Sequence, residues 1–150
     1  MTDTAAVGAT LRAEAQRCAQ QLMAELAGVT AVVVATVDGF DVASCIRGDD
    51  DPSRIAAMAS SISAIGGVIS MEAGLGTYTS VTINTESGFA VVYAVARSDV
   101  ELVVNVIANS DGILAQVPLP DGDKISYPFF KRAQGFFCAT QGLMFRALRK

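Results

Sequence analysis

Few side chains in this sequence could carry out catalysis, because none of its 150 residues is a histidine. Histidine is the usual general base near neutral pH and the commonest zinc ligand. Without it, an attacking serine or cysteine lacks its usual activating partner. Residues that could in principle act as nucleophiles are Ser60, Ser61, Ser63 and Cys45. A hydrolase is therefore the weakest functional hypothesis, and we expect no intrinsic enzymatic activity.

The cysteines and the acidic residues do not form a metal-binding pattern either. Cys18, Cys45 and Cys138 are odd in number and widely separated, as expected of reduced thiols rather than of disulfides or a metal site. The run Asp49–Asp51 could suggest a calcium loop, but neither alternating carboxylates nor a glutamate at the twelfth position follows it. Asp51 followed by proline is instead typical of a helix start. We expect no metal and no cofactor.

The composition is that of an interaction protein. Apolar residues make up 51% of the chain and charged residues only 17%, which favours an apolar surface that another chain covers. The net charge of −4, without a basic stripe carrying aromatic residues, argues against nucleic-acid binding. The N-terminus has neither the basic flank nor the apolar core of a signal peptide. We expect one cytoplasmic domain over residues 1–150.

Helices and strands must position any binding surface, and their order can be inferred from periodicity. Apolar residues at three- and four-residue steps predict a first helix over about residues 5–27, ended by Gly28. Residues 31–46 then contain two β-branched runs separated by Asp38-Gly39, which predicts a hairpin with a two-residue type I′ turn. A second helix is predicted over about residues 52–73.

Three β-rich runs follow the helix-ending glycines Gly74 and Gly76. They read TYTSVTIN, FAVVYAVA and VELVVNVIA, and their short connections predict an antiparallel meander. The first strand, over residues 76–85, contains no Lys, Glu, Asp or Pro, the residues that normally protect a sheet edge. It is therefore either central in its own sheet or an edge that pairs with a second copy, and we favour the second possibility.

The second helix could be mistaken for a membrane span, since residues 55–71 carry no charge. Its serines and glycines instead favour a buried helix of a soluble protein. We therefore expect no transmembrane segment.

The same helix carries two stripes at helical spacing. Bulky residues suited to packing on a sheet are Ile55, Ala59, Ile62, Ile65 and Ile69. Mostly small residues, which let helix axes approach closely, are Ala57, Ser60, Ala64, Gly67 and Met71. The small stripe either packs against a second copy or fits the domain's own core. Favouring the first alternative, we predict a dimer interface of Ala57, Ser60, Ala64, Gly67, Met71, Thr77, Thr79 and Val81.

The C-terminal region is less regular. Pro118 and Pro120 interrupt any helix that begins near residue 110. Apolar residues beyond Pro128 recur at helical steps, so residues 118–150 are predicted to form a loop and then an amphipathic helix. Its basic residues suit a membrane surface or a partner, or simply the helix dipole.

Three stretches resemble the Roadblock/dynein light chain family, and specifically its bacterial type that regulates small Ras-like GTPases. They are GVTAVVVATVDGFDVAS at 28–44, the alanine-rich helix after Asp51, and LVVNVIANSDGILAQV at 102–117. The resemblance spans about residues 8–117. It implies an α/β fold of the α+β, profilin-like type, with an antiparallel five-stranded sheet and the order helix, hairpin, helix, three-stranded meander, helix. The prolines after Val117 depart from the family, whose last helix follows the last strand closely.

The resemblance also implies a function. Family members form homodimers in which the first meander strands pair and the long helices lie side by side. They bind a GTPase as noncatalytic regulators or scaffolds and do not hydrolyse nucleotide themselves. The expected partners are thus a second copy of the chain and a small Ras-like GTPase. The alternative is a small-molecule sensor of the PAS or GAF type, which fold alone would not separate from a regulator.

A candidate GTPase-binding surface lies between the two stripes of the second helix. Helical spacing predicts that its outward-pointing residues are Arg54, Met58, Ser61 and Val68. They combine one charge with apolar and hydroxyl groups, which suits a reversible interface. The alternative is that they are ordinary surface positions.

Overall fold

A computed structural model describes residues 2–96, 100–109 and Leu148. The elements follow one another as α1 (Thr2–Glu25), β1 (Val29–Thr36), β2 (Asp41–Ile46), α2 (Pro52–Glu72), β3 (Ser80–Asn84), β4 (Gly88–Ala96) and β5 (Glu101–Asn109). This order confirms the predicted helix, hairpin, helix and meander. The predicted loop and helix over residues 118–150 and the thiol of Cys138 lie outside the described residues, apart from Leu148.

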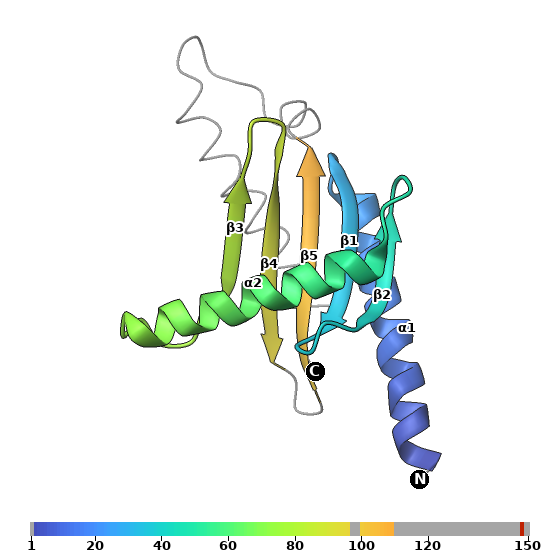
Figure 1. Cartoon of the computed structure of the whole chain (residues 1–150). Helices are drawn as coiled ribbons and strands as arrows, with labels where there is room; N and C mark the ends of the chain where they lie inside the picture. The colour runs from blue at the N-terminus through green and yellow to red at the C-terminus, as the bar shows by residue number, and fades with distance from the viewer. Residues whose placement is uncertain (1, 97–99, 110–147, 149–150) are drawn as a thin grey trace.

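The five strands form one antiparallel sheet in the order β2-β1-β5-β4-β3. The pairing of β1 with β5 joins the N-terminal hairpin to the meander, so β2 and β3 are the two edge strands. The α2 helix crosses one face of the sheet, and α1 lies near the β1–β2 end (Figure 1). Of the two alternatives for the first meander strand, the structure therefore selects the edge.

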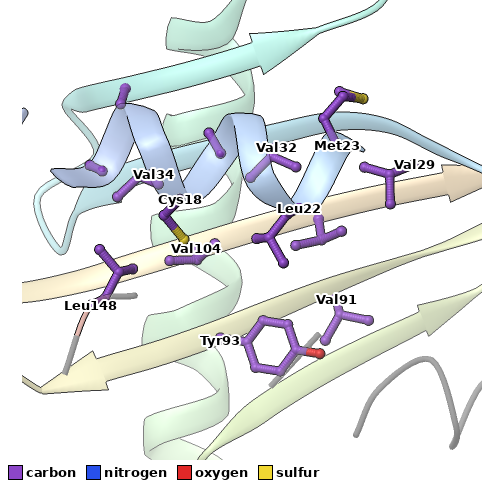
Figure 2. Packing of buried hydrophobic residues seen from close by; sticks show 14 of the residues in the cluster. Cys18, Leu22, Met23, Val29, Val32, Val34, Val91, Tyr93, Val104 and Leu148 are labelled. Carbon is purple, nitrogen blue, oxygen red and sulfur yellow. The ribbon is translucent and has the colours of Figure 1, made fainter. Parts of the chain in front are cut away.

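The larger hydrophobic cluster lies on the side of the sheet that α1 covers. Alternation along the strands turns Val32 and Val34 toward α1, where they meet Cys18 and Leu22 (Figure 2). Tyr93 and Leu148 are fully buried in the same cluster. Burying each large apolar side chain contributes about 1.5–3 kcal/mol relative to exposure, so this layer supplies most of the apolar stabilisation.

The packing under α2 is made of smaller groups. One cluster joins Ile55 and Ala56 to Val33 and Ala35 of β1, and another places Ala59 against Val92 and Val103 of the meander. Between these clusters lies Asn105, which pairs with Val33 on one side and Val92 on the other. Its side-chain oxygen is buried and has no hydrogen-bond partner among the described residues. A buried oxygen without a partner lowers the stability of this layer.

Several local signals in the sequence act as predicted. The Asp51 side chain accepts hydrogen bonds from the Ser53 amide at 2.9 Å and the Ser53 hydroxyl at 2.7 Å, so it caps α2, and Pro52 takes the first helical position. Gly28, Gly74 and Gly76 follow helices with φ values of 86°, 65° and 83°, a region that favours glycine.

The predicted type I′ turn at Asp38-Gly39 is wrong. The Gly39 amide donates to the Thr36 carbonyl at 3.0 Å and the Thr36 amide donates to the Phe40 carbonyl at 2.9 Å, so Val37 and Asp38 are the central residues of the turn. Gly39 follows them with φ 91°. Three residues therefore connect the strands, and a glycine bulge completes the hairpin. The Asp-Gly pair correctly predicted that the chain reverses here, but not how many residues form the turn.

The bulky stripe of α2 also differs from the prediction in its second half. Ile55 and Ala59 are buried and Ile62 packs against the second cluster, but Ile65 and Ile69 are 60% and 58% exposed. With 3.6 residues per turn, the buried face continues from Ile62 to Gly66 rather than to Ile65. The α2 helix also extends beyond β3 (Figure 1), so its last turns have no sheet of their own chain beneath them.

Within the described part of the chain, α2 is the one helix whose length and apolar composition would allow it to cross a membrane. Only 22% of its most apolar window is buried inside the structure. Most side chains of α2 are thus not buried in the part of the chain that the structure describes, which makes α2 the centre of the candidate site.

Candidate interaction surface

The outward side of α2 forms an exposed and mainly apolar surface, which we call the α2 face. Its members recur at three- and four-residue steps, as expected for one side of a helix. They are Arg54, Ala57, Met58, Ser61, Ala64, Ile65, Val68, Met71 and Glu72, all exposed. Its charged residues, Arg54 and Glu72, lie near opposite ends of the helix, and the Ser61 hydroxyl donates to the Ala57 carbonyl at 3.0 Å. The middle of the face is therefore apolar.

The structure places all four predicted partner residues on this surface. Arg54, Met58, Ser61 and Val68 are exposed, and they span four turns along the α2 face. Helical spacing alone was sufficient for this placement. Ile65 belongs to the same side but was assigned to the sheet.

The predicted dimer stripe divides into two groups. Ala57, Ala64 and Met71 are exposed and belong to the α2 face, whereas Ser60 and Gly67 are half-buried. The two predicted surfaces of the helix, one for dimerisation and one for a partner, therefore form one continuous surface. Its margin consists of the half-buried residues Ser60 and Gly67.

Part of that margin is explained by the chain's own hairpin. A Cβ added at Gly39 would lie 3.3 Å from the Ser60 Oγ and 3.4 Å from the Ala57 Cα. The turn between β1 and β2 thus approaches α2 closely, and small residues at 57 and 60 permit this approach. Ser60 is half-buried beside this turn, whereas Ala57 stays exposed on the α2 face, and the dimer interface at these two positions remains a prediction.

The C-terminal part of α2 exposes several apolar residues, of which only Leu75 had not been singled out from the sequence. Leu75 just after the helix is 75% exposed and Met71 is 78% exposed, in addition to Ile65 and Ile69. The C-terminal end of α2 extends past β3 (Figure 1). An apolar helix end without a covering layer is typical of a protein interface. The available signal was the 3.6-residue drift, but the sequence does not reveal where the sheet ends.

The outer edge of β3 lies beside this helix end. The Ala94 amide donates to the Thr79 carbonyl at 3.1 Å, so the backbone groups of Thr79 point toward β4. The backbone groups of the alternate residues Val81 and Ile83 also point toward β4. The backbone groups of Ser80, Thr82 and Asn84 therefore point away from the sheet. Between described residues, no side chain is hydrogen-bonded to them. Within the described part of the chain, this outer edge of β3 is therefore unpaired.

The three interface residues predicted on this segment differ in their positions, and their part in a dimer remains a prediction. Thr77 and Thr79 are exposed but precede β3, and Val81 turns its side chain toward α2. The backbone groups that point outward belong to Ser80, Thr82 and Asn84. Which set of alternate residues this is depends on the register of β3 with β4, and the sequence did not specify that register.

A compact joint holds β3 against α2. A Cβ at Gly66 would lie 2.8 Å from the Val81 Cγ2 and 3.4 Å from the Tyr78 Cδ2, so the side chains of these two residues occupy the space beside the glycine. The hydroxyl groups of Ser63 and Tyr78 are hydrogen-bonded to each other. This joint fixes the open edge relative to the α2 face, so both parts can act as one surface.

The electrostatics of the described residues do not indicate catalysis. The hydrogen bonds from Ser53 lower the pKa of Asp51 below its usual value of 3.8, which keeps the cap charged. Burial raises the pKa of the Cys18 thiol to about 11, which makes it a poor nucleophile. Within the described ranges, no three His, Cys, Asp or Glu side chains are arranged to hold a metal ion.

Comparisons with known proteins give a family for this architecture. The Roadblock/LC7 domain family model matches residues 15–106. No curated protein matches the chain. A solved Roadblock/LC7 domain from Streptomyces avermitilis is similar in structure, with a TM-score of 0.58 at 18% identity over 86% of this chain and 97% of that one.

Two solved MglB structures are also similar. The gliding protein MglB from Thermus thermophilus has a TM-score of 0.65 at 9% identity, over 92% of this chain and 90% of that one. An MglB with a tetrameric arrangement has a TM-score of 0.60 at 12% identity, over 92% of this chain and 93% of that one. At such identities the similarity shows a shared fold.

Proposed function

We propose that this chain, which belongs to the Roadblock/LC7 domain family, is a noncatalytic homodimeric regulator or scaffold that binds a small Ras-like GTPase in the cytoplasm. Family membership and the MglB neighbours suggest a role in small-GTPase regulation. The observation that carries the proposal is the exposed apolar end of α2 beside the open edge of β3.

The first part of the proposal is the dimer. Two copies related by a twofold axis would pair their β3 edges through Ser80, Thr82 and Asn84, which continues the sheet across both chains. The overhanging end of each α2 would then lie over the joined sheets and bury Ile65, Ile69, Met71 and Leu75. One twofold arrangement would pair the β3 edges and bury the apolar ends of α2 at the same time, which supports one interface rather than two.

The dimer is tested by a charge placed on the α2 face. Ala64→Glu should shift wild-type dimers to monomers in light scattering at micromolar concentration, because a carboxylate would be buried between the helices. Ala24→Glu is the matched control, since Ala24 is exposed on α1 and should leave the mass unchanged. A wild-type protein that is monomeric at this concentration would rule out the proposed dimer.

The second part is the GTPase, which would bind the α2 face through residues spread along the helix. Arg54 provides the charge, and Met58, Ser61 and Val68 provide a mixed apolar and hydroxyl surface. Small Ras-like GTPases from the native source can be tested by titration calorimetry against wild type and Arg54→Glu. We expect binding to weaken about tenfold or more, as for loss of a charged contact at a partly desolvated interface.

Arg12→Glu provides the matched control for that measurement, because Arg12 is an exposed arginine on α1. Both variants must retain the wild-type circular dichroism and mass. Equal affinities for all three proteins would exclude the α2 face as the GTPase site, and wild type that binds no GTPase would contradict the function itself.

A further inference from the structure

The sheet has two edge strands, yet a closed dimer needs only one of them. If both β2 and β3 were open, the β2 edge of one copy could pair with the β3 edge of the next. Such a head-to-tail contact adds copy after copy, into a ring where its rotation closes and into a filament where it does not. The structure should therefore contain a feature that makes the two edges different.

That feature is a side-chain amide on α1. Gln16 donates from its Nε2 to the Ser44 carbonyl at 2.9 Å and accepts from the Ser44 amide at its Oε1 at 3.3 Å. One primary amide thus engages both backbone groups of a single residue in β2. These are the two hydrogen bonds that a neighbouring strand would make with Ser44.

The β2 register shows that these groups belong to the free edge. Cys45 pairs with Val32, and the Arg47 amide donates to the Thr30 carbonyl at 2.8 Å. The backbone N–H and C=O groups of residues 45 and 47 therefore point toward β1. By alternation, the backbone groups of Ser44 point away from β1, to the outer side of the sheet. Ser44 is also central in a strand of only six residues, so blocking it interrupts the whole short edge.

The opposite edge has no such protection among the described residues. No side chain there is bonded to the outward groups of Ser80, Thr82 or Asn84. Both edges lack a proline. The β2 strand begins with the charged Asp41 at one end, and the Gln16 amide blocks its centre, whereas β3 has neither feature.

We propose that Gln16 closes the β2 edge against a second copy of this chain and so confines sheet pairing between copies to β3. This inference deepens the proposed homodimer and rests on it for the role of β3, but the blocking of β2 can be tested independently. The structure assigns Gln16 a role that its sequence context alone, an ordinary glutamine on an amphipathic helix, does not reveal.

The test removes the Gln16 side-chain amide and measures two quantities, the hydrogen exchange rate of the Ser44 amide and the mass of the assembly. In Gln16→Ala, hydrogen exchange of the Ser44 amide should accelerate by about tenfold, the equivalent of one lost hydrogen bond. The mean mass by sedimentation velocity should rise above the wild-type value at micromolar concentration. Gln21→Ala is the control, since the Gln21 amide bonds only to the exposed Glu25 carboxylate at 2.8 Å and should change neither quantity.

A second variant separates edge pairing from unfolding or nonspecific aggregation. Ser44→Pro removes the outward amide donor without breaking a bond to β1, and proline is tolerated on sheet edges. The double variant Gln16→Ala, Ser44→Pro should return to the wild-type mass. A mass that stays high in the double variant would show that the excess assembly does not use β2.

The remaining outcomes also decide the question. If Gln16→Ala accelerates Ser44 exchange but keeps the wild-type mass and fold, the amide does not control assembly and the inference fails. If wild type is monomeric, the proposed dimer fails, while a rise in mass on Gln16→Ala that Ser44→Pro reverses still supports the closed edge. If Gln16→Ala unfolds, Gln16→Glu repeats the test, because a carboxylate accepts from the Ser44 amide but cannot donate to its carbonyl.

Discussion

Two adjacent glycines on α2 have different surroundings. At Gly66 an added Cβ would meet Val81 at 2.8 Å, whereas at Gly67 the nearest atom, on Tyr78, would be 3.9 Å away. Both are helical, so alanine would bring the same gain in helix propensity at either position. A difference between the two variants therefore measures the close approach of β3 to the helix.

We predict that Gly66→Ala is less stable than Gly67→Ala by about 1–3 kcal/mol, the usual cost of overpacking a tight contact. Urea unfolding followed by circular dichroism gives the free energy of unfolding of each variant. Equal stabilities would mean that the joint between α2 and β3 is looser than the structure indicates. The wild-type chain is the reference for both.

At the scale of single elements, the N-terminus of α2 depends on one carboxylate. Asp51 accepts two hydrogen bonds from Ser53, and these bonds lower its pKa below 3.8. A carboxyl whose pKa is lower in the folded state stabilises the fold above its unfolded pKa, and this stabilisation is lost as the pH falls through the folded value. The cap is thus strongest near neutral pH.

We therefore predict that Asp51→Ala lowers the melting temperature at pH 7 and that its difference from wild type narrows below about pH 4. Asp51→Asn is the matched control, because asparagine is also a good cap but does not titrate. It should retain most of the wild-type stability at pH 7. Thermal unfolding at pH 7 and pH 3 checks both statements, and an unchanged difference for Asp51→Ala at pH 3 would contradict them.

At the scale of the whole molecule, the direction of the backbone groups along β3 identifies Thr82 as a residue through which a second copy would extend the sheet. The backbone groups of Thr82 point away from β4, so removing its amide hydrogen leaves the sheet of one chain intact. That hydrogen is required only if a second copy pairs with β3. The residue is also central in the strand, where loss of a bond interrupts pairing most.

We predict that Thr82→Pro is monomeric and folded, whereas Thr82→Ala, which keeps the amide hydrogen, remains dimeric. Light scattering gives the mass, and circular dichroism confirms the fold. A dimeric Thr82→Pro would place the interface elsewhere, for instance on the α2 face alone.

Much of the architecture could be inferred from local sequence features. The order of the elements, the cap at Asp51 and the reversal at Asp38-Gly39 depend on residues close to one another in the chain. The outward direction of Arg54, Met58, Ser61 and Val68 also follows from helical spacing alone. Such properties are determined by steric preferences and periodicity within one element, which the sequence contains directly.

The tertiary structure decided what depends on two elements meeting. Ile65 is exposed because the buried side of α2 continues through Gly66, which packs against β3. Val81 and not Thr82 turns toward α2 because of the register with β4, and Ser60 is half-buried because Gly39 approaches it. Gln16 reaches the backbone of Ser44 across 28 positions of sequence. Contacts of this kind depend on register and sheet width, which are set by the packing of the whole chain and not by any one segment.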